Sequence, residues 1–231
     1  MGRTRTRLDL HRLSAHVLGR RRFAVSGHFG LRASPGGIAT PAFGPEPETL
    51  RLTSACLIRE VGTDSSGLAL AGATLAALAD FAGADLGAEF SAGADTPDLG
   101  RIDEPLALDA HELDDLFSWF DLAWRVLDQV VAEWRGRGPA TTVQLWPEHF
   151  DVGTALDFGD GDGAGVNLGF SPGDGFSDQP YVYVGPWGTE RPGADGYWNA
   201  PFGAVLSSTD APDRAACVSF MRAGLDRLSS P

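Results

Sequence analysis

The sequence has no lysine, since all 18 of its basic residues are arginine, and it has few cysteines. Cys56 and Cys217 form no CxxC pair, which excludes a zinc ribbon or a thioredoxin-type site. Each lies in an apolar periodic segment, so buried free thiols are expected in preference to a disulfide. No apolar run approaches the roughly 18 residues of a membrane helix, and the N-terminus has no secretory signal pattern. We therefore expect a cytoplasmic protein with no membrane partner.

Motifs with a defined reaction are also missing from the sequence. There is no GxSxG serine, P-loop or GxGxxG segment, so a nucleophilic triad and a phosphate-binding loop lack support. The segment 157–167, DFGDGDGAGVN, suggests a calcium loop, but Phe158 and Gly169 stand where Asp and Glu ligands are needed. An Asp-Gly hairpin turn near Asp162 explains the same residues. The sequence alone therefore decides neither whether the protein is an enzyme nor which cofactor it holds.

Charge is distributed unevenly along the chain, whose net charge is −13. Residues 1–59 carry ten arginines against three acids, a net charge of +7, while the remaining residues carry −20. A basic arm can contact nucleic acid. Here the arm has no interleaved aromatic residues and the rest of the chain would repel phosphate, so we expect no nucleic-acid partner. The basic segment is instead expected to dock against the acidic remainder of the same chain.

The spacing of apolar residues predicts an α+β fold, with a mainly antiparallel sheet packed against one long central helix and terminal helices. Asp109 and Glu112 have the capping-box spacing, and an apolar stripe follows them to Gly136. Shorter helices are expected at 9–19, 74–82 and 212–228, and strands at 23–32, 50–58, 68–70, 141–146, 149–158, 166–171 and 181–185. The chain is predicted to form a single domain, residues 1–231, with a surface loop or a subdomain boundary at 84–105.

A functional site is most expected in the stretch 144–187. On an extended strand, His149 and Asp151 point to the same side. With the hairpin turn centred near Asp162, Gly153 would lie opposite Ser171, which brings both side chains beside the SPGD loop. The face that they share is lined by small residues and should leave room for a ligand: Gly153, Ala155 and Gly169.

Acidic and aromatic side chains are expected to complete this site. The full candidate set is His149, Asp151, Asp174, Tyr183, Trp187, Trp198 and Asn199. In this hypothesis His149 is a general base or a ligand-orienting group, and Asp151 orients it. The aromatic residues would form the wall of a small-molecule pocket.

Two other interpretations stay open. In a non-catalytic structural or interaction protein, the aromatic residues belong to the core, and His149 and Asp151 are hydrogen-bonded partners. In a divalent-metal-dependent hydrolase, Glu148 and His149 bind an ion with Asp151 or Asp174. Metal sites usually need three protein ligands, so we assign no metal ligand from the sequence. The oligomeric state is not defined by the sequence.

The motifs WPEHFD, SPGD, PYVYVGPW and WNAPFG resemble those of an uncharacterised family of actinobacterial hypothetical proteins. The resemblance covers roughly residues 141–225 and, more faintly, the HRLSAHVLG and PGG segments near the N-terminus. It implies that WPEHFD, SPGD and YVYVGPW belong together as one unit, in agreement with the expected hairpin. It implies no activity and no catalytic residue.

Overall fold

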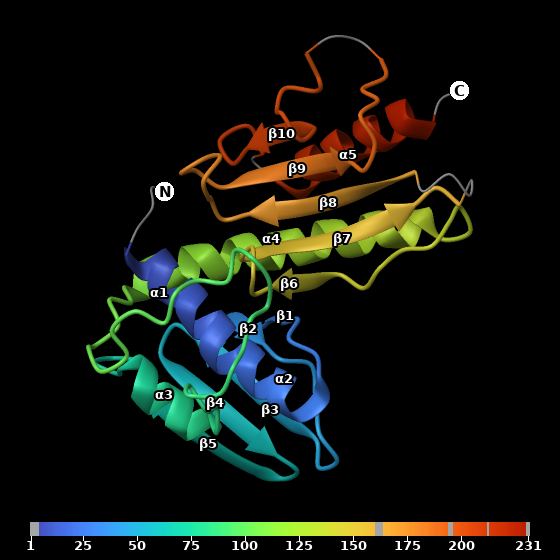
Figure 1. Ribbon diagram of the computed structural model, residues 1–231. Coiled ribbons are helices and arrows are strands. Elements are labelled where there is room, and N and C mark those ends of the chain that lie inside the picture. Colours follow the sequence, from blue (N-terminus) through green and yellow to red (C-terminus); the bar gives the residue numbers. More distant parts are fainter. Residues whose placement is uncertain (1–4, 160–163, 194–195, 212, 230–231) are drawn as a thin grey trace. The chain divides into compact units, whose positions relative to one another are not determined.

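The computed structural model describes residues 5–159, 164–193, 196–211 and 213–229 (Figure 1). By its internal contacts the chain divides into two units. The described residues of the N-terminal unit lie within 3–121 and 145–150, and those of the C-terminal unit lie within 122–144 and 151–231. One division falls within the long helix, whereas the stretch 84–105 lies inside the N-terminal unit.

The predicted α+β class is confirmed by two antiparallel sheets of five strands and a long central helix. This helix, α4, runs from Ala110 to Trp134, and Glu112 N donates to Asp109 Oδ1 at 3.0 Å, as the capping box predicts. Its buried stripe is Leu113, Leu116, Phe117, Phe120, Ala123, Val126, Leu127, Val130 and Trp134. Within the described part of the chain, no helix is both long and apolar enough to cross a membrane.

The sheet of the N-terminal unit is a meander in which each strand pairs with the next. Its strands are β1 (Arg32–Ser34), β2 (Gly37–Ala39), β3 (Glu48–Thr53), β4 (Cys56–Val61) and β5 (Asp64–Ala69). The single strand predicted at 50–58 is wrong, because β3 and β4 form a hairpin there. Cys56 N donates to Thr53 Oγ1 at 3.1 Å across the turn, a local interaction that strand alternation does not reveal.

The first helical segment is longer than predicted and removes part of a predicted strand. Helix α1 (Arg5–Leu13), the π-helix η1 (Ser14–Gly19) and α2 (Arg20–Ser26) follow one another without a break. The strand predicted at 23–32 is therefore wrong, because residues 23–26 are helical and only Arg32 of the predicted range lies in a strand, β1. Phe23 and Val25 are 39% and 38% exposed, so their alternation with polar residues marks no buried face. Gly27 ends α2 in the left-handed conformation, with its N donating to Phe23 O at 2.8 Å.

A buried carboxylate joins α2 to the N-terminal sheet. Glu48 is 5% exposed and accepts hydrogen bonds from Arg21 at 2.7 Å and from Arg59 at 2.9 Å. Two cations around one buried anion compensate for the loss of water around it. These arginines of the basic first segment thus pair with an acid of the same segment.

Helix α3 (Leu75–Ala82) matches its prediction closely. Thr74 caps it, accepting a hydrogen bond from Ala77 N at 3.1 Å, and Gly83 ends it with φ of 70°. Its fully buried Leu75 and Leu78 face the interior of the unit, and α3 packs against η1. The stretch after α3 contains no helix or strand until α4, as expected for a loop.

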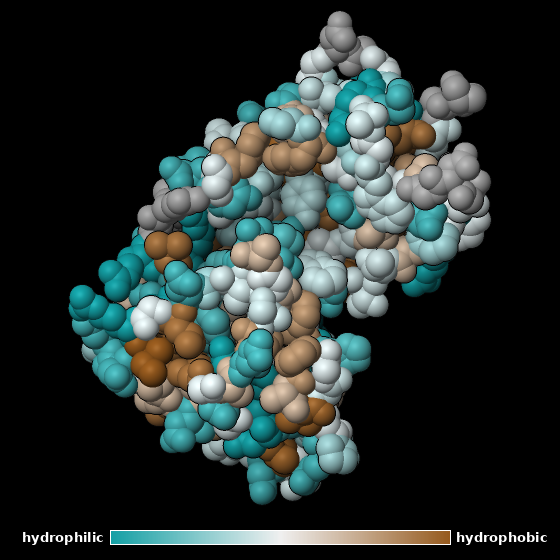
Figure 2. All heavy atoms as spheres, viewed as in Figure 1, coloured by the Kyte–Doolittle hydropathy of each residue, from teal (hydrophilic) through white to brown (hydrophobic). Residues whose placement is uncertain are grey.

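The second sheet has the order β10-β9-β8-β7-β6. Its strands are β6 (Gln144–Trp146), β7 (Asp151–Asp157), β8 (Gly165–Ser171), β9 (Tyr181–Pro186) and β10 (Ala204–Ser207). The sequence did not predict β10, which has four residues. On the face seen in Figure 2, hydrophobic residues gather over β9 and β10. Phe176 and Phe202, which are 47% and 37% exposed, have ring centroids 5.0 Å apart in this unit.

Two helical segments of the C-terminal unit are joined by an ion pair. Helix α5 (Arg214–Ser229) contacts β9 and β10, and its Arg222 binds Glu133 of α4 through two nitrogens, at 2.6 and 2.9 Å. Trp134 packs edge-on against Phe158 at 5.4 Å. Pro212, predicted to start the last helix, and the Asp-Gly turn at 160–163 lie outside the described residues.

The register of the β7–β8 hairpin differs from the predicted one by two residues. Gly153 lies opposite Gly169, where the sequence analysis placed Ser171. A shift of two residues keeps every side chain on its predicted face, since alternate residues of a strand share a face. Two glycines, Gly153 and Gly169, therefore lie directly opposite each other, which the predicted register did not place together.

Candidate functional site

The glycine face of β7 and β8, expected to be open, is covered by Tyr183. A Cβ atom on Gly169 would lie 2.3 Å from the Tyr183 hydroxyl oxygen, and one on Gly153 would lie 3.2 Å from it. This hydroxyl donates to Asp151 Oδ2. Burial and then the charge of Asp151 raise the pKa of Tyr183 well above its ordinary value, so the hydroxyl remains a donor. The glycines thus make room for a side chain of the same unit.

Asp174 organises the SPGD loop to which it belongs. Its Oδ1 accepts hydrogen bonds from Phe176 N at 2.8 Å and Ser177 N at 3.2 Å. Its Oδ2 accepts from Ser171 Oγ at 3.1 Å and from the Tyr181 hydroxyl. Burial, followed by the hydrogen bond to Asp174, raises the pKa of Tyr181. Both oxygens are therefore committed to holding the loop.

The three remaining candidates of this unit have local structural partners. Trp187 is 45% exposed, and its indole N–H donates to Asn167 Oδ1 at 2.9 Å. Trp198 Nε1 donates to a backbone carbonyl of the preceding loop at 2.9 Å. Asn199 accepts from Val205 N at 2.8 Å and donates to Val205 O at 3.0 Å. Each side chain thus fixes a turn or a strand end.

His149 lies in a turn and not on the strand predicted at 149–158. Strand β7 begins at Asp151, and Phe150 before it has φ of 59°. A positive φ is rare for a bulky side chain, and it breaks the strand geometry on which the predicted shared face depended. Phe150 N donates to Trp146 O at 2.7 Å and closes the turn. His149 and Asp151 consequently have different partners.

An acid that the sequence analysis did not select, Asp95, lies beside His149. The imidazole Nδ1 is 3.0 Å from Asp95 Oδ2, and Nε2 is 3.6 Å from Glu148 Oε2. One potential ligand atom from each of the three side chains can be chosen so that all lie within 4.8 Å of one another. The side chains of Asp95 and His149 are 70% and 53% exposed, and that of Glu148 is 19% exposed. These three residues form a candidate metal centre.

A tight turn presents Asp95. Ser91 Oγ donates to Gly93 O at 3.0 Å, and Thr96 Oγ1 donates to the same oxygen at 2.7 Å. Thr96 Oγ1 also accepts from Ala92 N at 2.9 Å. Two hydroxyls therefore fix the backbone on both sides of Asp95, although its carboxylate reaches solvent.

A buried histidine holds the other segment of the candidate metal centre. His11 Nε2 donates to Pro147 O at 2.8 Å and Glu148 O at 3.1 Å. Its ring stacks on Phe150, with centroids 4.8 Å apart and planes 11° apart. Burial lowers the pKa of His11, so a neutral ring that carries its proton on Nε2 fits these contacts. The backbone of Glu148 is thereby anchored.

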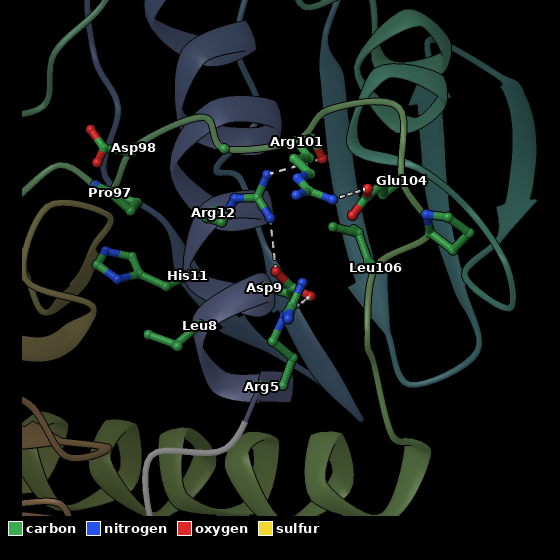
Figure 3. Close-up of a pocket in the computed structure, with 12 residues that line it drawn as sticks. Arg5, Leu8, Asp9, His11, Arg12, Pro97, Asp98, Arg101, Glu104 and Leu106 are labelled. Atoms are coloured by element: carbon green, nitrogen blue, oxygen red, sulfur yellow. Dashed lines mark hydrogen bonds and ion pairs between the residues drawn. The ribbon is translucent and has the colours of Figure 1, made fainter.

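The same unit contains a cleft of about 660 Å³ between α1 and the segment 97–106 (Figure 3). Its wall combines apolar side chains such as Leu8 and Leu106 with arginines and acids. The charged residues are Arg5, Arg12, Arg101, Asp9, Asp98 and Glu104. The wall has as many acids as arginines, so its charge does not attract anions in general.

Arg12 reaches from α1 toward the segment opposite, as Figure 3 shows. Its Nη1 donates to Asp9 Oδ1 at 2.8 Å, and its Nη2 donates to Leu99 O. Its Nε is buried and has no acceptor among the residues that the structure describes. Buried donors almost always have a partner, so this nitrogen is an exception, and it is enclosed by protein and does not open into the cleft.

Buried side chains of η1 and α2 tie the loop after α3 to the helices. His16 Nε2 donates to Pro97 O at 2.5 Å, and Arg20 Nη1 donates to Asp85 O at 3.0 Å and Ala88 O at 2.6 Å. Arg20 Nη2 also donates to His16 Nδ1 at 3.2 Å. A guanidinium only donates, so Nδ1 carries no proton and His16 is neutral. Burial lowers the pKa of His16 in the same direction.

The sequence analysis missed Asp95, His11 and Arg12. Asp95 lies in a segment rich in Ala, Gly and Asp, where no periodicity indicates its neighbours. One usable signal was the N-terminal helix, in which histidines and arginines are interspersed with apolar residues. Buried polar side chains need partners, and that pattern indicates a further segment packed on the helix.

No family model matches the chain, and comparisons with curated proteins and with solved structures gave no match either. The resemblance to the actinobacterial family therefore stays a prediction. The function is argued from the geometry of the residues themselves.

Proposed function

We propose that this protein binds a small polar molecule in the cleft between α1 and residues 97–106. The observation that carries the proposal is a cleft of about 660 Å³ whose wall combines apolar side chains with arginines and acids. Small-molecule sites commonly measure roughly 300–1,000 Å³ and combine an apolar wall with a few orienting polar groups. Leu8 and Leu106 supply the apolar part.

The ligand should carry a hydrogen-bond acceptor such as a carboxylate or a phosphate. The terminal nitrogens of Arg12 already bind Asp9 and Leu99 O, which fixes the plane of the guanidinium. A ligand acceptor in the cleft would therefore meet a guanidinium whose orientation is already set. The acids in the wall balance the arginines, so we expect one oriented acceptor in preference to several negative charges.

The proposal keeps the class of function that the sequence suggested and changes its location. In the C-terminal unit, Asp151, Asp174 and the tyrosines bind one another, and Tyr183 occupies the space over the glycines. The cleft of the N-terminal unit has room for a ligand and polar side chains in its wall. The alternative is a structural or interaction protein with no small ligand.

A screen of small carboxylates and phosphates by thermal shift, followed by calorimetry, tests the proposal. Leu8→Trp fills the cleft from a position that is 47% exposed and should weaken binding at least about tenfold, or 1.4 kcal/mol. Val25→Trp, at a 38% exposed position of α2 outside the cleft wall, is the matched control. Equal affinity in both variants would place the ligand elsewhere, and a screen without hits would favour the structural alternative.

We also propose that the protein is cytoplasmic and has no nucleic-acid partner. The net charge of −13 and the use of Arg12, Arg20 and Arg21 in internal hydrogen bonds support this view. Cell fractionation and a low-salt binding assay with duplex DNA and RNA test the two statements. Recovery in the membrane fraction, or salt-sensitive binding to either nucleic acid, would contradict them.

A further inference from the structure

We propose that Asp95, Glu148 and His149 bind one divalent transition-metal ion, for which zinc is the best match. The site lies in the N-terminal unit and does not depend on the ligand proposed for the cleft. Its three potential ligand atoms lie within 4.8 Å of one another. They come from segments more than 50 residues apart, since His149 and Asp95 differ by 54 positions.

The geometry needs only a small adjustment to close around an ion. His149 Nδ1 is 3.0 Å from Asp95 Oδ2, and the other ring nitrogen, Nε2, is 3.6 Å from Glu148 Oε2. Only one of the two nitrogens would bind the ion, and with one ligand atom from each residue all three lie within 4.8 Å. Ligand atoms about 2.0–2.2 Å from a tetrahedral zinc ion are about 3.3 Å apart. A separation of 4.8 Å would have to shorten by about 1.5 Å to reach that distance, and the exposure of Asp95 and His149 leaves their side chains free to rotate.

The ligand types indicate the class of metal. One imidazole with two carboxylates suits zinc and neighbouring first-row ions, whereas magnesium and calcium prefer all-oxygen sets. The two carboxylates of Asp95 and Glu148 match the charge of a divalent ion. Three protein ligands also leave a coordination position for water, as in open zinc sites.

Gly93 is the residue that allows the carboxylate of Glu148 to approach the Asp95 turn. A Cβ atom at position 93 would lie 1.8 Å from Glu148 Oε1 and 1.9 Å from Glu148 Cδ, so any side chain there would displace the carboxylate. The Gly93 backbone is held by Ser91 and Thr96. Glu148 is held from the other side by its hydrogen bond to His11. The turn before Asp95 and the backbone of Glu148 are therefore fixed before any ion binds, while the exposed side chains of Asp95 and His149 can still adjust.

An ordinary surface pair on the same chain provides a comparison. His111 and Asp115 lie one helical turn apart on α4, with Nδ1 and Oδ2 separated by 3.4 Å and both side chains exposed. This pair offers two ligand atoms on one helix, which is too few for a stable site. If zinc binds the protein through surface histidines in general, this pair should contribute as much as His149.

Calorimetric titration of chelator-treated protein with zinc chloride tests the proposal. We expect one ion per chain, a loss of affinity of about 100-fold in His149→Ala, and a loss of at least about tenfold in Asp95→Asn. Both positions are more than half exposed, and melting curves establish that the variants are folded. His111→Ala and Asp115→Asn are the matched controls and should bind like the unmodified protein. Magnesium chloride should bind more weakly than zinc.

Gly93→Ala tests whether the positions of the ligands matter as well as their chemical identity. It keeps all three ligands but moves the Glu148 carboxylate, and it should weaken zinc binding at least about tenfold. The proposal is overturned if the protein takes up no zinc, or if His149→Ala binds as well as the unmodified chain. It is also overturned if the His111 and His149 variants lose the same affinity, which would indicate adventitious surface binding.

Discussion

The hairpin face of the C-terminal unit and the loop-covered helices of the N-terminal unit both collect acids, aromatic rings and hydrogen-bond donors, but they use them differently. On the hairpin, Asp151 accepts from Tyr183, and Asp174 accepts from Tyr181. On the helices, His11 and Arg12 hold neighbouring backbone, while the side chains of Asp95 and His149 are more than half exposed. Similar residue types thus form a closed network in one place and leave accessible groups in the other.

The difference follows from how each surface is built. Cross-strand register sets fixed distances between neighbouring side chains, so a carboxylate and a hydroxyl on one face of a sheet can bind each other. A loop tied to a helix through its backbone carbonyls uses the donors of the helix, so a carboxylate of the loop such as that of Asp95 can stay exposed to solvent. A convergence of chemically active residues therefore indicates a site only where their hydrogen bonds are not already made inside the protein.

The largest loss of stability is expected from Gly169→Ala on β8, which tests whether Tyr183 fills the hairpin face. The new Cβ would lie 2.3 Å from the Tyr183 hydroxyl oxygen and 2.4 Å from Cζ, so the ring must leave its place. We expect a loss of about 3 kcal/mol in the free energy of unfolding by urea. Gly185→Ala in the same sheet is the control, because its nearest neighbour would be 3.6 Å away. Equal stability of the two variants would mean that Tyr183 does not fill the hairpin face.

A smaller effect is expected from Tyr183→Phe, which removes one hydroxyl. The lost bond is to a buried carboxylate, Asp151, which is 8% exposed, so we expect a cost of about 2 kcal/mol. Tyr197→Phe removes a bond of 2.8 Å to the carbonyl of Phe220 and should cost about 1 kcal/mol. Chemical denaturation of both variants measures the difference. A smaller loss at Tyr183 than at Tyr197 would contradict the view that the hairpin acid depends on its tyrosine.

The sequence predicted the elements whose signals are local. The Asp109 cap and the apolar stripe of α4 lie in one continuous stretch of sequence, and the Thr74 cap is adjacent to α3. Strand alternation gave the correct faces of β7 and β8, but alternation has a period of two and cannot fix a register that differs by two. All of α2 was missed, because the predicted helix ended at Gly19 and the spacing of Phe23 and Val25 resembles a strand over a stretch too short to distinguish the two patterns.

The candidate site was predictable only in part, for a different physical reason. His149 was in the candidate set and Glu148 only in the metal-hydrolase alternative, and the acid that approaches His149 lies 54 positions away in a loop without periodicity. Nothing local to Asp95 indicates that its loop lies on the N-terminal helices, since the hydrogen bonds of His16 and Arg20 make that contact. The positive φ of Phe150 likewise depends on its packing against His11 and Phe120.

The smallest expected effect concerns acid sensitivity, which should belong to the N-terminal unit because all five histidines lie there. Burial lowers the pKa of His16 below 6.5; the charges of Arg20 and Arg12 act in the same direction, and the hydrogen bond to Pro97 and the charge of Asp98 oppose it. The unfolded chain then binds the proton more tightly than the folded one. The contribution of His16 to stability is therefore complete above about pH 6.5 and declines as the pH falls below that value.

Urea unfolding at about pH 7.5 and about pH 5.5 should show this loss, on the order of 1 kcal/mol, and His16→Gln should reduce it. Hydrogen exchange locates the effect. Protonation of His16 Nδ1 removes the bond from Arg20, so amides of the loop after α3 should exchange faster at the lower pH, while those of β7 to β9 change little. His111→Gln, on an exposed side chain, should keep the pH dependence of the unmodified protein. Faster exchange in the hairpin than in the loop would reverse the contrast between the two surfaces, because it would place the acid-sensitive contacts among the tyrosine–carboxylate pairs.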